Sequence, residues 1–198
     1  MDQHKKQLAH KGLLLFLREF FTHPSAMGAT FPSSNLLAKT IAQQIALPTN
    51  GYIVELGAGT GSITSGLLTH GIAAEKLIII ERSRAMATHL GKRFPQLKII
   101  NGDAQNLADL LNTHFHPVSA VVSSLPLRTL PKELVQKIGE QLENILDENG
   151  IFIQFTYNFW SKPLSPSPHF HCTHSHHVWW NLPSARVDVF KKNLGVRS

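Results

Sequence analysis

Short apolar runs alternate with segments of helical periodicity through most of this 198-residue chain, and that alternation limits the possible folds more than any other feature. The apolar runs are four to six residues long and rich in Ile, Val and Leu, as expected of strands buried on both faces. The expected strands are Tyr52 to Leu56, Leu77 to Ile80, Leu97 to Ile100, Ala120 to Ser123 and Ile151 to Thr156, and the expected helices are Ser62 to His70, Arg84 to Lys92, Leu107 to Leu111 and Lys132 to Leu146. Strands that alternate with helices predict a parallel sheet covered on both faces.

The C-terminal part of the chain departs from this alternation. Residues 160 to 177 are rich in Pro, Ser and His and show no period, so a long loop is expected there. Two short apolar segments, Val178 to Asn181 and Arg186 to Phe190, follow on either side of Leu182-Pro183-Ser184. They predict an antiparallel hairpin on the sheet edge, which gives an α/β fold with a seven-stranded, mostly parallel sheet.

The N-terminal part predicts two helices, at residues 4 to 22 and at about 35 to 45, so that residues 1–47 form a helical segment and 48–198 the main domain. The first helix has an apolar stripe flanked by basic residues. The residues expected to contact a membrane are Leu13, Phe16, Leu17, Phe20, Lys11 and Arg18. Such a helix suits a lipid interface. Docking on its own domain is the alternative, and the sequence leaves both open.

Composition sets further limits. The length suits one domain with a proper core, and a single cysteine, Cys172, excludes an internal disulfide and favours a reducing cytosol. The net charge of +6 favours anionic partners, either nucleic acid or a membrane surface. The apolar run at 13 to 17 is far shorter than the roughly 20 residues of a spanning helix, and no signal-peptide cleavage pattern follows it.

The stretch VELGAGTG, residues 54 to 61, places three glycines directly after the first expected strand. In a parallel sheet the ligand crevice lies at the carboxyl ends of the strands, so this turn is where a ligand comes close to the backbone. Gly57, Gly59 and Gly61 permit a tight turn without side chains. The dinucleotide fingerprint needs its third glycine at position 62, which is Ser62 here.

This Gly-x-Gly-x-Gly pattern, preceded by Glu55, resembles the first motif of the class I methyltransferases, which use S-adenosylmethionine and have a Rossmann-like fold. The resemblance covers residues 50 to 157. It implies that Glu81, at the end of the second strand, holds the ribose hydroxyls, and that Asp103, after the third strand, recognises the adenine amino group. The cofactor-binding residues that it implies are Glu55, Gly57, Ala58, Gly59, Gly61, Glu81, Arg82, Asp103, Ala104 and Ser123.

Three later motifs resemble a narrower family, the short soluble bacterial phosphatidylethanolamine N-methyltransferases. These are VVSSLPLRTLP, GIFIQFTYNF and VWWNLPSARV, and an early segment, MGATFPSSNLLAKTI, also resembles that family. The resemblance implies up to three methyl transfers to the lipid head-group amine, giving phosphatidylcholine. It also implies a monomer on the inner face of the cytoplasmic membrane, which contacts an anionic phospholipid surface and no nucleic acid.

The resemblance also suggests the acceptor side of the site. Ser123 ends the fourth strand, where the methyl group is delivered, and Tyr157 ends the fifth, where its hydroxyl can hold the amine. Packing of the Tyr157 ring on the cofactor is the alternative. Arg186 is a candidate for the lipid phosphate or else a surface arginine. The amine must lose a proton to a base or through desolvation, and a histidine of the run at 169 to 177 suits that task.

A rival interpretation and a metal site are both disfavoured. Adenine N6-methyltransferases of ribosomal RNA share the fold and a basic surface, but their fourth-strand motif needs an Asn and a stacking aromatic ring, where this chain has Ser124 and Leu127. The run HFHCTHSHH, residues 169 to 177, matches no standard zinc spacing, and methyl transfer needs no metal, so an exposed substrate loop is expected.

Overall fold

The computed structural model describes residues 32–157, 160–180 and 184–193. Its contacts divide the chain into two units, residues 1–30 and residues 31–198. Helix α2 (Pro32–Ala42) therefore belongs to the same unit as the sheet, where it packs on helix α3 (Ser62–Thr69). The domain boundary that the sequence suggested at residue 47 lies within this second unit.

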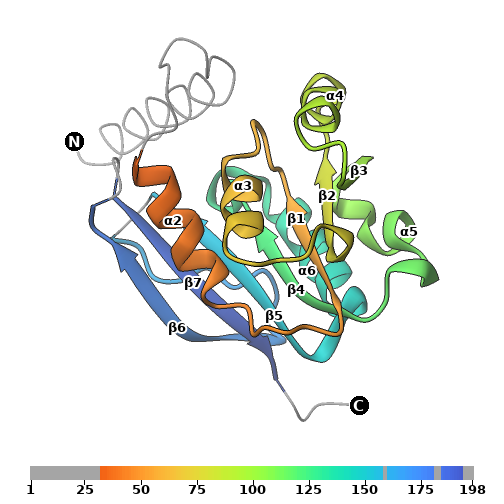
Figure 1. Ribbon diagram of the computed structural model, residues 1–198. Coiled ribbons are helices and arrows are strands. Elements are labelled where there is room, and N and C mark those ends of the chain that lie inside the picture. Colours follow the sequence, from red (N-terminus) through yellow and green to blue (C-terminus); the bar gives the residue numbers. More distant parts are fainter. Residues whose placement is uncertain (1–31, 158–159, 181–183, 194–198) are drawn as a thin grey trace. The chain divides into compact units, whose positions relative to one another are not determined.

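Seven strands form one sheet in the order β3-β2-β1-β4-β5-β7-β6 (Figure 1). They are β1 (Tyr52–Leu56), β2 (Leu77–Glu81), β3 (Lys98–Asn101), β4 (Val118–Ser123), β5 (Leu146–Thr156), β6 (Phe170–Val178) and β7 (Ala185–Lys192). The first five strands are parallel to one another, whereas β7 is antiparallel to both β5 and β6. The predicted fold class, a mostly parallel seven-stranded sheet with a C-terminal antiparallel hairpin, is confirmed.

Helices cover both faces of the sheet, as the alternating sequence pattern predicts. The remaining α-helices of the described part are α4 (Arg84–Arg93), α5 (Leu107–Leu111) and α6 (Lys132–Ile145). Side chains of α2, α3 and α4 share one apolar cluster, and side chains of α5 and α6 share the other. Neighbours in one strand contribute to opposite clusters: Ile53 packs with the first and Val54 with the second. The strands are apolar at successive positions because both of their faces are buried.

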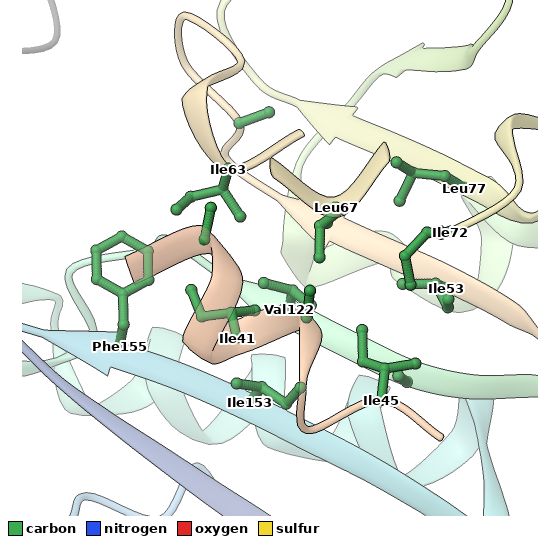
Figure 2. Packing of buried hydrophobic residues seen from close by; sticks show 14 of the residues in the cluster. Ile41, Ile45, Ile53, Ile63, Leu67, Ile72, Leu77, Val122, Ile153 and Phe155 are labelled. Atoms are coloured by element: carbon green, nitrogen blue, oxygen red, sulfur yellow. The ribbon is translucent and has the colours of Figure 1, made fainter. Parts of the chain in front are cut away.

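The first cluster joins α2 and α3 to the middle of the sheet (Figure 2). Ile41 and Leu67 from the two helices point toward Ile53 on β1, Val122 on β4 and Ile153 on β5 (Figure 2). Each of these five side chains is at most 2% exposed. Burial of this apolar surface holds the carboxyl ends of β1, β4 and β5 in fixed relative positions, which the site requires.

The strand order contains a reversal between β1 and β4. From β1 the chain passes to β2 and β3 on one side, and it then returns to β4 and β5 on the other side. In sheets of this kind the loops on either side of such a reversal move apart and leave a crevice at the carboxyl ends of the strands. The loops after β1, β2 and β3 and those after β4 and β5 therefore surround one expected ligand site.

The histidine-rich segment differs from the sequence-based expectation. A long loop was expected over residues 160–177, but residues from Phe170 to Val178 form strand β6, which pairs along its length with β7. The predicted hairpin is present, but its first strand lies earlier in the chain: β6 ends at Val178, where the predicted segment Val178 to Asn181 begins. The second strand, β7, is longer than the predicted Arg186 to Phe190. Strand β6 is an edge strand, and most of its side chains are polar or histidine and exposed. Its sequence therefore lacks the apolar pattern by which a strand is recognised.

Candidate active site

The turn after β1 contains the three glycines, and each of them adopts a left-handed backbone conformation. Their φ angles are +70° at Gly57, +56° at Gly59 and +83° at Gly61. A Cβ atom on Gly61 would also overlap the ring of Phe94, so this glycine is needed for packing on α4 as well as for the turn. The turn is further held by Arg93, whose guanidinium donates a hydrogen bond to the carbonyl of Thr60.

Glu55 lies beneath this turn and has no exposed surface. The hydroxyl of Thr64, in the first turn of α3, donates a 2.7 Å hydrogen bond to its Oε2, and Oε1 has no hydrogen-bond partner among the described residues. The pKa of Glu55 is raised to about 7, mainly by burial and also by the negative charge of Glu81, while the Thr64 hydrogen bond partly opposes this increase. Because Glu55 has no exposed surface, we expect it to act on a ligand in the crevice through the charge of its ionised form rather than by direct contact.

Glu81 ends β2 and is oriented by two backbone groups. Its Oε2 accepts a 3.1 Å hydrogen bond from the Gly59 N–H, and its Oε1 accepts a 2.8 Å hydrogen bond from the Ser83 N–H. The residue is 8% exposed. Each carboxylate oxygen keeps a free lone pair, so the fixed carboxylate can accept two further hydrogen bonds from a diol.

Asp103 follows β3 and begins a short 3-10 helix (Ala104–Asn106). Its Oδ1 accepts a hydrogen bond from the Gln105 N–H, and its Oδ2 lies 3.6 Å from Nη1 of Arg82. The Arg82 side chain is 79% exposed and that of Asp103 24%, so this ion pair is at the surface and adds little stability. Ala104 is almost completely buried.

The loop after β4 is tied to both neighbouring strands. Ser124 donates its N–H to the carbonyl of Leu56 on β1, and the side-chain amide of Gln154 on β5 donates a 3.0 Å hydrogen bond to the Leu125 carbonyl. The Ser123 hydroxyl accepts from the Leu125 N–H and the residue has no exposed surface. The buried hydroxyl of Ser123 therefore shapes this loop, and the predicted catalytic and cofactor-binding role of Ser123 stays a prediction.

Sequence reasoning missed Gln154, although its motif was noted. The sequence feature that could have identified Gln154 is a glutamine within an apolar strand, because a polar side chain buried there needs hydrogen-bond partners. Gln154 lies next to Ser123 across the β4–β5 pairing, and its buried Oε1 has no partner among the described residues. Thr64 was missed in the same way, since nothing in the sequence links it to Glu55 nine residues earlier.

Tyr157 follows β5 directly, at the same end of the sheet as the glycine turn. Its ring contacts Phe155 edge-on, with the ring centroids 5.7 Å apart. Burial raises the pKa of Tyr157 to about 12, so its phenol stays protonated at neutral pH. The hydroxyl can therefore donate or accept a hydrogen bond but does not act as a phenolate base.

Arg186 does not have the environment that the sequence suggested. It is 4% exposed on β7, and it forms a two-point ion pair with Asp188, with Nε to Oδ1 at 2.7 Å and Nη2 to Oδ2 at 2.8 Å. Ser175 on β6 donates a 2.6 Å hydrogen bond to the same carboxylate. The charge of Arg186 is thus buried and compensated by Asp188, and its predicted role at the lipid phosphate stays a prediction.

Most of the histidine run lies on the edge strand β6, and a cavity in the described part lies away from the expected cofactor-binding residues. No group of three or more His, Cys, Asp or Glu side chains in the described ranges is arranged to hold a metal ion. A cavity of about 840 Å³ lies between α6 and residues 164–170, and none of the expected cofactor-binding residues lines it. The crevice at the carboxyl ends of the strands remains the candidate site.

The residues expected to contact a membrane, Leu13, Phe16, Leu17, Phe20, Lys11 and Arg18, lie outside the described residues. Their role stays a prediction. Within the described part, every helix is too short or too polar to cross a lipid bilayer.

The arrangement at the crevice fits S-adenosylmethionine, which carries a ribose diol, an adenine and a positive sulfonium. Glu81 after β2 would hold the diol and Asp103 after β3 the adenine amino group. The buried, unpartnered oxygen of Glu55 behind the glycine turn provides negative charge for the cation. Adjacent strands carry the three groups: Glu55 lies in β1, Glu81 ends β2 and Asp103 follows β3, so all three are near the same carboxyl edge of the sheet.

Comparison with solved structures agrees with this fold. TrmN from Thermus thermophilus has a TM-score of 0.65 at 15% identity, over 83% of this chain and 51% of TrmN. The glycopeptide N-methyltransferase MtfA, solved with S-adenosylmethionine, has a TM-score of 0.64 at 13% identity, over 82% of this chain and 96% of MtfA. The fold and the site define a class I methyltransferase that uses S-adenosylmethionine.

Sequence comparison narrows the class to a family. The ornithine lipid N-methyltransferase of Singulisphaera acidiphila is 32% identical over 154 residues, which are 76% of this chain and 80% of that protein. The chain therefore belongs to the lipid N-methyltransferase family within class I. Ribosomal RNA small subunit methyltransferase A of Ruegeria is 35% identical over 106 residues, only 36% of its length. No protein-family model matches the chain.

Proposed function

We propose that this protein transfers methyl groups from S-adenosylmethionine to the head-group amine of phosphatidylethanolamine and its methylated forms, giving phosphatidylcholine. One observation carries the proposal: the two motifs expected at the acceptor side are joined beside the glycine turn. The SSLPL loop after β4 and the QFTY segment of β5 are connected by the hydrogen bond from Gln154 to Leu125. Membership of the lipid N-methyltransferase family supports the same substrate class.

Ornithine lipid is the second candidate acceptor. The relative from Singulisphaera is named for that lipid and is similar over most of both chains. The burial of Arg186 in an ion pair with Asp188 supports an acceptor that needs no phosphate-binding arginine at this position. Both candidate lipids present an amine at the membrane surface, so the same site chemistry serves either.

The chemistry at the site follows from the acceptor nitrogen. S-adenosylmethionine supplies a methyl group on a sulfonium, and a neutral amine must approach it in line. An alkyl amine has a pKa of about 10.4 in water, so it needs desolvation or a base to lose its proton. The half-buried Tyr157, beside Phe155, can accept a hydrogen bond from the amine and exclude water. After methylation, its ring can contact the cationic nitrogen.

Ribosomal RNA is a poor candidate acceptor. A flipped adenine would need an aromatic ring at position 127 on which to stack. Leu127 is only 4% exposed and packs in the second apolar cluster, with side chains of α5 and α6. The similarity to the RNA methyltransferases covers at most about half of this chain. We expect a monomer that binds an anionic phospholipid surface at the inner face of the cytoplasmic membrane.

One experiment tests the proposal and its alternatives. The purified full chain is incubated with methyl-labelled S-adenosylmethionine and, in parallel, with vesicles of phosphatidylethanolamine, vesicles that contain ornithine lipid, or ribosomal RNA. Label in the phosphatidylethanolamine extract supports the proposal. Label only in ornithine lipid replaces it with the second candidate, and label only in RNA overturns both.

A further inference from the structure

All three tryptophans of the chain are exposed to an unusual degree. Trp160 is 93% exposed, Trp179 64% and Trp180 89%, whereas the typical tryptophan of a folded protein is largely buried. We refer to these three residues as the tryptophan rim. Such exposure of three large apolar side chains is unfavourable in water, so it indicates a surface that contacts another molecule.

The sheet topology places the tryptophan rim at the same edge as the candidate active site. Strand β5 ends at Thr156, which pairs with Arg186 near the start of β7, and Val178 at the end of β6 pairs with Ala185. The carboxyl ends of β5 and β6 therefore lie at one edge, with the turns after β1 and β4 (Figure 1). Trp160 follows Tyr157 by three residues, and Trp179 and Trp180 follow Val178 directly.

Defined contacts hold the segments that carry these rings. The guanidinium of Arg186 donates a hydrogen bond to the Ser161 carbonyl, and that of Arg128 donates one to the Lys162 carbonyl. Both carbonyls lie within two residues of Trp160. The Trp179 ring stacks on His177, with centroids 5.6 Å apart and planes 21° from parallel. Arg186, which is buried in its ion pair with Asp188, thus holds the segment that follows Trp160.

We propose that the tryptophan rim inserts into the head-group region of a lipid bilayer and sets the active site at the depth of the substrate amine. This inference rests on the proposed function and names the surface by which that function reaches its substrate. Indole rings favour the interface between water and acyl chains, because their bodies are apolar and their N–H groups can remain hydrated. A lipid amine lies at that same level, so the lipid need not leave the membrane.

Charge around the same edge favours an anionic lipid surface over other partners. Arg82, after β2, and Lys162, after Trp160, are both exposed there, and the chain carries a net charge of +6. Cations near the head groups add attraction to anionic lipids, although each contributes modestly. The rings come from two separate segments, one after β5 and one after β6.

Intrinsic fluorescence tests the inference directly, because every tryptophan of the protein belongs to the rim. The full chain is titrated with vesicles of phosphatidylethanolamine and phosphatidylglycerol whose acyl chains carry bromine at a shallow or a deep position. We expect a blue shift of the emission and stronger quenching by the shallow bromine. Vesicle binding in sedimentation without quenching would overturn the inference, as would an emission change that depends on protein concentration without lipid.

Variants separate the rim from the catalytic machinery. We expect the triple variant Trp160→Ala, Trp179→Ala, Trp180→Ala to bind vesicles at least about tenfold more weakly. Affinity for S-adenosylmethionine and methylation of a short-chain phosphatidylethanolamine below its micelle concentration are expected to stay unchanged. Leu47→Ser is the matched control, since Leu47 is 46% exposed at the opposite, amino edge near Gly71. Unchanged vesicle affinity in the triple variant would contradict the proposal.

The readouts also separate this inference from the proposed function. If no lipid amine becomes methylated but the tryptophans are quenched by shallow bromine, the membrane-binding rim is supported and the substrate assignment fails. If the soluble short-chain lipid is methylated and the tryptophans are not quenched, the substrate assignment is supported and the rim fails.

Discussion

Thr64 and Glu55 form a hydrogen bond of 2.7 Å beneath the glycine turn, and they join the first turn of α3 to the end of β1. Both residues are completely buried. The turn between them carries the three left-handed glycines, so this bond closes the loop at its base. An ionised carboxylate that is buried with one unpartnered oxygen is energetically unfavourable. The site therefore favours either a positively charged ligand near Glu55 or a proton on its carboxylate.

That preference predicts the pH dependence of stability. Burial raises the pKa of Glu55 from 4.5 to about 7, so the native state keeps a proton that the unfolded chain has released between these pH values. Stability should therefore fall as pH rises through this window, by about 3 kcal/mol in all. Urea unfolding at several pH values measures this. In Glu55→Gln the part of this pH dependence that comes from residue 55 should disappear. A free energy of unfolding that depends on pH in the same way in the variant would contradict the raised pKa of Glu55.

The same carboxylate predicts the pH dependence of cofactor binding. A sulfonium is expected to favour the ionised form of Glu55, so binding of S-adenosylmethionine should release a proton below about pH 7 and tighten as the pH rises. Calorimetry in two buffers of different ionisation enthalpy counts the released protons. Glu55→Gln should release fewer protons. Equal proton release in both proteins would exclude Glu55 as the coupled group.

Replacement of Glu81 should weaken cofactor binding more than an equal change of charge elsewhere. Glu81→Gln retains the shape of the side chain but cannot accept from the Gly59 and Ser83 N–H groups and from a ribose diol at the same time. We expect a loss of affinity on the order of tenfold to a hundredfold in calorimetry. Glu75→Gln, on the exposed 3-10 helix before β2, is the control and should bind normally.

Asp103→Ala should also weaken binding, because the resemblance assigns it the adenine amino group. The Ala substitution breaks the surface ion pair with Arg82 as well, and that contact contributes little by itself. Arg82→Ala measures the loss of this ion pair together with any contact that Arg82, also expected at the cofactor, makes itself. Normal affinity in Asp103→Ala, measured by the same calorimetry, would remove this residue from the site.

A prediction on stability concerns the close contact of α2 and α3. A Cβ atom on Gly66 would overlap the Ala38 Cβ, so Gly66→Ala should cost about 1–3 kcal/mol despite the better helix propensity of alanine. Adding Ala38→Gly should recover part of the loss. Gly91→Ala in α4 is the control: its Cβ would meet nothing within 4 Å, so stability should rise by up to about 1 kcal/mol. Thermal or urea unfolding measures all three.

The parallel part of the fold could be predicted closely from the sequence. The expected strand Tyr52 to Leu56 agrees with β1, and the starts of α3, α4 and α6 agree as well, because buried strands and amphipathic helices have different periods. Strand β6 could not be found in this way. An edge strand with exposed His, Ser and Thr side chains lacks the apolar pattern, and only its pairing with β7 forms it.

The site was partly predictable for a related reason. The positions of the glycine turn, of Glu81 and of Asp103 can be predicted, because each lies at or just after the end of a strand that the sequence pattern identifies. Which polar side chains become buried depends on contacts between distant segments. Arg186, which the sequence suggested as a phosphate ligand or a surface arginine, is buried against Asp188, and the hydroxyl of Ser123 accepts a hydrogen bond from the Leu125 N–H.

The last prediction concerns the N-terminal helix that the sequence suggests, and it separates two possible membrane contacts. Converting Phe16, Leu17 and Phe20 to polar residues removes the apolar stripe and should abolish sedimentation with anionic vesicles while leaving cofactor affinity intact. The tryptophan rim predicts a further distinction. If the helix supplies most of the vesicle affinity and the rim sets the depth, brominated lipid at high concentration should still quench the fluorescence of Trp160, Trp179 and Trp180 in the helix variant. Vesicle binding unchanged from the original protein would exclude the helix as a membrane contact.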